Sequence, residues 1–112
     1  MRVVITQFAD PVPIPSPVAS GLTATAGGQT GARELTARVN VITAVAAGQG
    51  VKLKPIAGNQ MQVMNRGGAD LLVFPPASTQ IENYGLNVAV VIPAGGAATF
   101  TWDGVDKWWQ TQ

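Results

Sequence analysis

The sequence predicts an all-β protein, a small β-sandwich or jelly-roll-like barrel with an extended Pro-rich N-terminal arm. Two observations predict this fold. Short runs of β-branched and aromatic residues recur along the chain, and clusters of Gly, Pro and Asn separate them at the spacing of hairpins. The change in composition places the arm at residues 1–32 and the β-sandwich domain at residues 33–112. A chain of 112 residues is long enough for one core but not for two.

Proline dominates the predicted arm. Four prolines in the seven residues 11–17 fix φ repeatedly, which favours an extended polyproline-like segment over a core element. Residues 20–32 are rich in Gly, Thr and Ala and show no periodicity, so the alternative interpretation of residues 1–32 is a disordered tail. Apolar side chains along the arm favour instead a segment ordered by neighbouring subunits. These candidate contact residues are Ile5, Phe8, Val12, Ile14 and Val18.

The next two segments read as strands. Residues 35–45 are mostly β-branched and alternate, which predicts a long strand. After a Gly-rich turn, residues 51–54 alternate Val and Leu with Lys52 and Lys54. Lysines on a strand discourage stray pairing, so this segment is predicted to be an exposed edge strand.

Residues 61–76 read as a hairpin on which the rest of the fold is organised. Residues 61–65 alternate as a strand, and residues 65–70 suit a turn because they include Asn65 and the pair Gly67-Gly68. The return strand at 71–74 has no polar face, so one side is expected against the core and the other against a second layer or a subunit. Leu72 and Phe74 are therefore candidate subunit or shell contacts.

The C-terminal third predicts two further hairpins. The elements expected in order are a loop at 77–85 pinned by Ile81 and Tyr84, a buried strand at 88–92, a turn at 93–96 and a return strand at 97–102. Asp103-Gly104 is typical of a hairpin turn and leads into a last strand at 107–111. Trp108 and Trp109 are neighbours on that strand and point to opposite faces. One is expected to fill the core, and the other to contact a subunit or a ligand.

The composition favours a protein that other molecules cover. Charged residues make up 12% of the chain, against about 25% in a typical soluble domain. The alternative is a surface rich in Ser, Thr, Gln and Ala. The seven basic residues are scattered among six acidic ones, which does not indicate nucleic-acid binding. Neither a signal peptide nor a run of about 20 apolar residues is present, so we expect a soluble protein with no membrane association.

Catalysis and cofactor binding are not expected. The chain has no His and no Cys, which removes the commonest general base, thiol nucleophiles, disulfides and thiolate metal sites. Of the six carboxylates, Asp70, Asp103 and Asp106 fall in predicted turns, where Asp commonly accepts bonds from its own backbone. We therefore predict no enzyme activity, no cofactor and no metal site. Aromatic rings could instead form a sugar-binding platform, and the candidates are Tyr84, Trp102, Trp108 and Trp109.

The pattern of residues 31–112 resembles small structural proteins of tailed-bacteriophage virions. It contains a strand ending in Asn65-Arg66-Gly67, an apolar strand ending in Phe74-Pro75 and an Ile-containing loop at residues 81–83. A strand at 88–92, a Gly-rich turn, a strand with Phe100 and the C-terminal Trp108-Trp109 complete it.

This resemblance implies a virion structural protein of the capsid decoration (cement) or head-fibre-base type. Such a protein is made in the host cytoplasm and sits on the capsid surface, is usually a homotrimer and has the major capsid protein as its partner. It would bind and stabilise the icosahedral head through subunit contacts. The alternatives are a receptor- or glycan-binding module of a tail fibre or baseplate and a small host lectin. The initial Met and the short C-terminus favour a free-standing protein over a fibre module.

Overall fold

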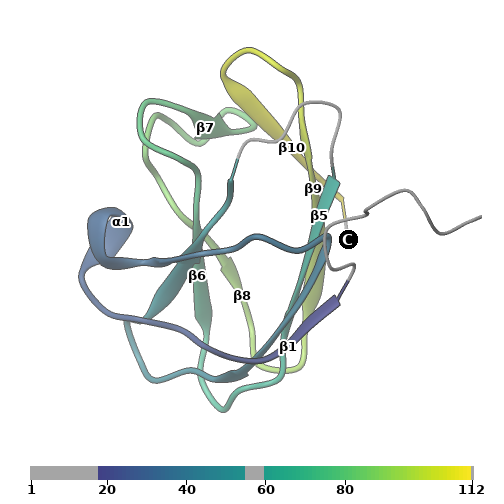
Figure 1. The fold of residues 1–112 in the computed structure, drawn as a ribbon. Coiled ribbons are helices and arrows are strands. Elements are labelled where there is room, and N and C mark those ends of the chain that lie inside the picture. The colour runs from purple at the N-terminus through teal and green to yellow at the C-terminus, as the bar shows by residue number, and fades with distance from the viewer. Residues whose placement is uncertain (1–17, 55–59, 112) are drawn as a thin grey trace, which may run out of the picture.

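The computed structural model describes residues 18–54 and 60–111, which form a mostly β structure with two mixed sheets (Figure 1). Its elements are β1 (Val18–Thr23), α1 (Gly28–Gly31), β2 (Arg33–Glu34), β3 (Val39–Ala44), β4 (Gly50–Lys52), β5 (Gln60–Asn65), β6 (Leu71–Phe74), β7 (Gln80–Ile81), β8 (Val90–Ile92), β9 (Ala97–Trp102) and β10 (Lys107–Thr111). None of the helices in the described part is long and apolar enough to cross a membrane.

From β1 to β9, successive strands alternate between the two sheets. The six-stranded sheet has the order β1-β3-β5-β9-β10-β7, and the four-stranded sheet has the order β2-β4-β6-β8. From β1 to β6 the chain winds as a coil, because β1, β3 and β5 pair in parallel in one sheet while β2, β4 and β6 pair in parallel in the other. The chain then reverses, so that β8 pairs antiparallel with β6 and β9 pairs antiparallel with β5.

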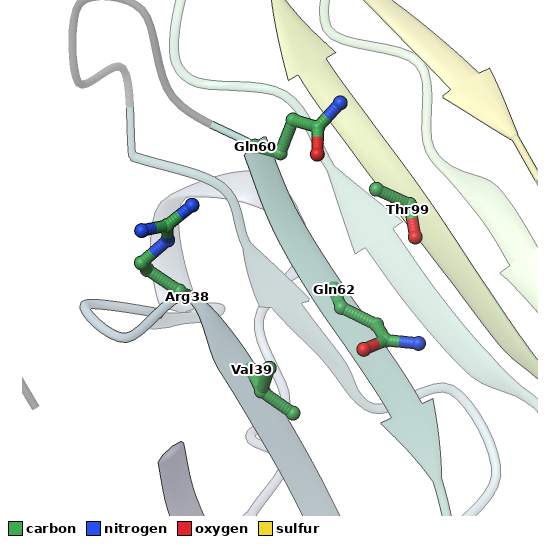
Figure 2. A pocket seen from close by; sticks show the side chains of 5 residues that line it. All are labelled: Arg38, Val39, Gln60, Gln62 and Thr99. Carbon is green, nitrogen blue, oxygen red and sulfur yellow. The ribbon is translucent and has the colours of Figure 1, made fainter. Parts of the chain in front are cut away.

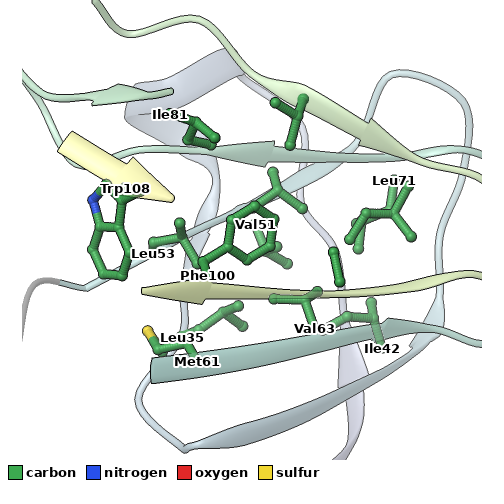
Figure 3. Packing of buried hydrophobic residues seen from close by; sticks show 14 of the residues in the cluster. Leu35, Ile42, Val51, Leu53, Met61, Val63, Leu71, Ile81, Phe100 and Trp108 are labelled. Atoms are coloured by element: carbon green, nitrogen blue, oxygen red, sulfur yellow. The ribbon is translucent and has the colours of Figure 1, made fainter. Parts of the chain in front are cut away.

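Both sheets contribute to a single hydrophobic cluster (Figure 3). The strands bury every second side chain, as the alternation in the sequence predicts; in β5, for example, Met61 and Val63 are buried while Gln62 is partly exposed. Phe100 and Trp108 are the largest fully buried side chains. Leu71 and Val73 of β6 pack into this cluster from the four-stranded sheet.

The predicted hairpin at 61–76 is wrong, and so is the hairpin predicted around residues 93–96. β5 and β6 lie in different sheets, and so do β8 and β9. Each connection is a corner that carries the chain from one sheet to the other. The hairpin at Asp103-Gly104 is confirmed, because β9 and β10 pair antiparallel.

Two other predictions are corrected. β4 is not an edge strand, because it lies between β2 and β6. Lys52, the last residue of β4, therefore does not prevent pairing at an open sheet edge. Within residues 18–32, which were assigned to the arm, β1 pairs with β3 along the six-stranded sheet. The folded domain therefore begins at Val18 at the latest, and the rest of the predicted arm lies outside the described residues.

Candidate functional site

The structure places the predicted contact residues in very different environments. Ile5, Phe8, Val12 and Ile14 lie outside the described residues. Val18 begins β1 and is 52% exposed. Trp109 is 47% exposed whereas Trp108 is fully buried, which confirms that the two side chains point to opposite faces.

Trp108 is a core residue and cannot be a shell contact in this fold. Its ring centroid lies 5.0 Å from that of Trp102, and Ile81, its partner on β7, is also fully buried. The indole nitrogen Nε1 of Trp108 has no hydrogen-bond partner among the described residues. Packing alone therefore holds this ring.

Leu72 and Phe74 are half-buried on the outer face of the four-stranded sheet. Neighbouring β4 explains part of this burial. A Cβ atom added to Gly50 would lie 3.0 Å from the Phe74 ring and 2.7 Å from the Leu72 carbonyl oxygen, so the glycine leaves room for the ring. The neighbouring strand of the same sheet thus covers part of these side chains, and the predicted subunit contact stays a prediction.

Asn65-Arg66-Gly67 forms a corner between the sheets. The fully buried Asn65 donates from Nδ2 to the carbonyl oxygens of Ala69 and Ile92, at 2.8 and 2.9 Å, and its Oδ1 accepts from the Gly67 amide at 3.0 Å. Arg66 donates from Nη1 to the Gly95 carbonyl oxygen at 3.0 Å. These bonds tie the corner after β5 to the corner after β8, so the motif has a structural role.

Large apolar side chains gather on the segment from Tyr84 to Val91, which we call the 84–91 surface. Tyr84, Leu86, Val88 and Val91 are between 45% and 57% exposed. The prediction of a buried strand at 88–92 therefore holds for Val90 and Ile92 of β8, which are buried, but is wrong for Val88 and Val91. The prediction that Tyr84 pins its loop is also wrong, because this side chain is exposed. A hollow of about 370 Å³ lies here, bounded by Tyr84, residues 88–91 and Gln110 of β10. The surface adjoins β8, which is an edge strand.

The loop that carries the 84–91 surface is firmly held. The Glu82 amide donates to the Trp108 carbonyl oxygen at 2.7 Å, and the Glu82 carboxylate accepts from the Gln110 amide at 3.1 Å. Asn87 accepts at Oδ1 from the Ser78 amide and from Gln29 Nε2, at 2.8 and 3.0 Å. The apolar side chains are therefore presented on an ordered backbone.

A second, polar pocket of about 160 Å³ lies on the outer face of the six-stranded sheet (Figure 2). Arg38, Val39, Gln60, Gln62 and Thr99 line it, and they come from β5, β9 and the start of β3. Sequence reasoning missed this pocket. The available signal was the alternation of Gln60 and Gln62 with buried Met61 and Val63, but the pairing of β5 with β3 and β9 could not be deduced from it.

The carboxylates of the described residues form no cluster. In the turn after β9, the Val105 amide donates to Asp103 Oδ1 at 2.8 Å, and the amides of Asp106 and Lys107 donate at 3.2 Å each. The hydrogen bond from the Val105 amide is the main cause that lowers the pKa of Asp103. The other two amides and the Lys107 charge lower it further. The predicted turn role of Asp103 is confirmed. Among the described residues, no three His, Cys, Asp or Glu side chains lie together as metal ligands would.

These features define a small, β-rich, two-sheet domain with an apolar surface on an ordered loop and a polar pocket on one sheet. No family model, curated protein or solved structure matches this chain.

Proposed function

We propose that this protein is a virion structural protein, a capsid decoration (cement) protein of a tailed bacteriophage. In this role it is made in the host cytoplasm, binds the major capsid protein on the head surface, and stabilises the shell through subunit contacts rather than through catalysis. The sequence pattern of residues 31–112 and the low charge of the chain support the proposal. For the architecture, we favour a β-sandwich over a jelly roll, since both sheets contain parallel pairs whereas a jelly roll is antiparallel.

The 84–91 surface is the observation that carries the proposal. Scattered exposed hydrophobic side chains are normal in soluble proteins, but a contiguous group on an ordered loop is typical of an interaction site. Four large side chains within eight residues, each about half exposed, leave apolar area that a partner could cover. The backbone needs little further ordering to bind, which reduces the entropy cost of association.

Light scattering and head binding test this function. We expect the isolated protein to be a homotrimer at micromolar concentration and to sediment with phage heads that lack it. The double substitution Leu86→Ser and Val91→Ser should weaken trimer formation or head binding by tenfold or more, because a loss of about 1.4 kcal/mol is enough for that change.

Val105→Ser is the matched control. Val105 is 79% exposed in the β9–β10 turn, outside the 84–91 surface, so its loss should leave both measurements unchanged. A monomeric mass by light scattering would contradict the predicted homotrimer. Failure to sediment with the heads would contradict the cement function.

A further inference from the structure

We propose that the polar pocket on the six-stranded sheet binds an oligosaccharide that carries a carboxylate group. The pocket is distinct from the 84–91 surface, and the two share no lining residue. It lies on the solvent-facing side of the sheet (Figure 2), where Gln62 pairs with Val39 of β3 on one side and with Thr99 of β9 on the other. Directly paired residues point to the same face of a sheet, so these side chains form one row.

The polar side chains that line the pocket have no hydrogen-bond partner in the described part of the chain. Within residues 18–54 and 60–111, the side chains of Arg38, Gln60, Gln62 and Thr99 make no hydrogen bond to another described residue. Two amides, a hydroxyl and a guanidinium group thus offer several donors and acceptors to a ligand in one place.

Other amide side chains of the same protein contrast with these. Asn40 donates from Nδ2 to the Ala37 carbonyl oxygen at 2.8 Å, and Gln49 accepts from the Ala46 amide at 3.0 Å. Asn65 makes three bonds. These bonded amides stabilise corners and turns, whereas Gln60 and Gln62 do not hold the fold together in this way.

The charge of the pocket selects the class of ligand. Among the described residues that line the pocket, Arg38 is the one that carries a charge, and none has a carboxylate. A guanidinium group matches a carboxylate with two parallel hydrogen bonds, and amides and hydroxyls match sugar hydroxyls. A uronic acid or another acidic sugar presents both kinds of group on one ring.

Trp109 extends the site along the same face. The register places Gln60 opposite Thr101, and Thr101 opposite Trp109. Two inter-strand steps separate Gln60 from the half-exposed indole, roughly 10 Å. The Lys107 ammonium lies 5.2 Å from the centroid of this ring and adds a second positive charge. An oligosaccharide of a few residues can place one ring in the pocket and another against the indole.

Titration of the full-length protein with three acidic tetrasaccharides tests the proposal. The probes are oligomers of galacturonate, mannuronate and hyaluronan, each compared with its carboxyl-reduced counterpart. Calorimetry gives the affinity, and NMR reports the side-chain amide signals of Gln60 and Gln62. At least one acidic probe should bind with a dissociation constant below about 10 mM and at least tenfold more tightly than its reduced form.

The variants assign the site. Arg38→Gln should remove the preference for the acidic probe, and Gln62→Ala and Trp109→Ala should each weaken binding severalfold. Arg33→Gln, at an exposed arginine on β2 of the other sheet, is the charge-matched control and should bind normally. Absence of binding by all three probes, or equal binding by Arg38→Gln and the control, would overturn the proposal. Arg38→Gln and Gln62→Ala should leave the mass by light scattering and the binding to heads unchanged, which separates this site from the proposed cement function.

Discussion

Asn65 joins two corners of the fold through one buried side chain. Both of its Nδ2 protons and its Oδ1 atom are used, and its backbone carbonyl oxygen accepts from the Gly95 amide at 2.8 Å. Gly67 belongs to the same corner, since an added Cβ atom would lie 2.7 Å from the Val45 side chain. The corner therefore requires a small residue as well as an amide.

Asn65→Ala should destabilise the protein strongly. It leaves the buried Ile92 carbonyl oxygen, the part-buried Ala69 carbonyl oxygen and the part-buried Gly67 amide without their partner, and a buried unsatisfied group costs about 1–3 kcal/mol. We expect a loss of about 2–5 kcal/mol in the free energy of unfolding, measured by chemical denaturation. Asn83→Ala is the control, because Asn83 is exposed and, among the described residues, its side chain bonds only by accepting from Lys107 Nζ. A loss for Asn65→Ala below about 1 kcal/mol would contradict the assigned role.

Asp103 makes the stability of the β9–β10 turn depend on pH. Because backbone amides lower its pKa in the folded state, its contribution is fully present above the unfolded pKa, near about 4, and is lost as pH falls through the folded value. The melting temperature of the wild type should therefore drop below about pH 4, and Asp103→Asn should reduce this drop. If the two proteins show the same acid dependence of melting temperature, Asp103 does not contribute in this way.

At the scale of the elements, the sequence predicts strands better than their connections. Alternation located β3, β5, β9 and β10, and it separated Trp108 from Trp109. The connections after β5 and β8 were misassigned because Gly and Asn suit a hairpin turn and a corner between sheets equally well. Tertiary contacts decide between the two, such as the bond from Asn65 to the Ile92 carbonyl oxygen, which joins residues 27 positions apart.

The 84–91 surface and the polar pocket could not be predicted from the sequence for the same reason. The apolar run at 88–92 is equally compatible with a buried strand and with an exposed surface, and in the structure Val90 and Ile92 are buried whereas Val91 points to the opposite, exposed face. The pocket forms only when three strands pair, and this pairing joins residues far apart in the sequence. From the sequence alone, Gln60 and Gln62 indicate only that one strand has a polar face.

At the scale of the whole molecule, β10 separates the two surfaces. Trp109 points to the outer face of the six-stranded sheet with Thr101, whereas the next residue, Gln110, borders the hollow of the 84–91 surface. Two successive residues of one strand thus border different candidate sites. A subunit bound at the 84–91 surface would leave the pocket face available to a second ligand.

The last prediction separates the N-terminal segment from the folded domain. Deletion of residues 1–17 should leave the circular dichroism and the thermal transition nearly unchanged, because every described strand begins at or after Val18. Deletion of residues 1–23 should destabilise the domain, since it removes β1, the strand that pairs with β3, together with Leu22, which packs against the core.

Under the proposed function, the shorter deletion should nevertheless weaken binding to heads. It removes Ile5, Phe8, Val12 and Ile14, and each of these side chains contributes on the order of 1.5–3 kcal/mol when fully buried, less the entropy of ordering. The single substitutions Phe8→Ser and Ile14→Ser should reproduce part of the loss in cosedimentation without a change in circular dichroism. Equal binding by the truncated and the full chain would show that these residues do not contact the shell, and the 84–91 surface would then have to provide the binding energy without them.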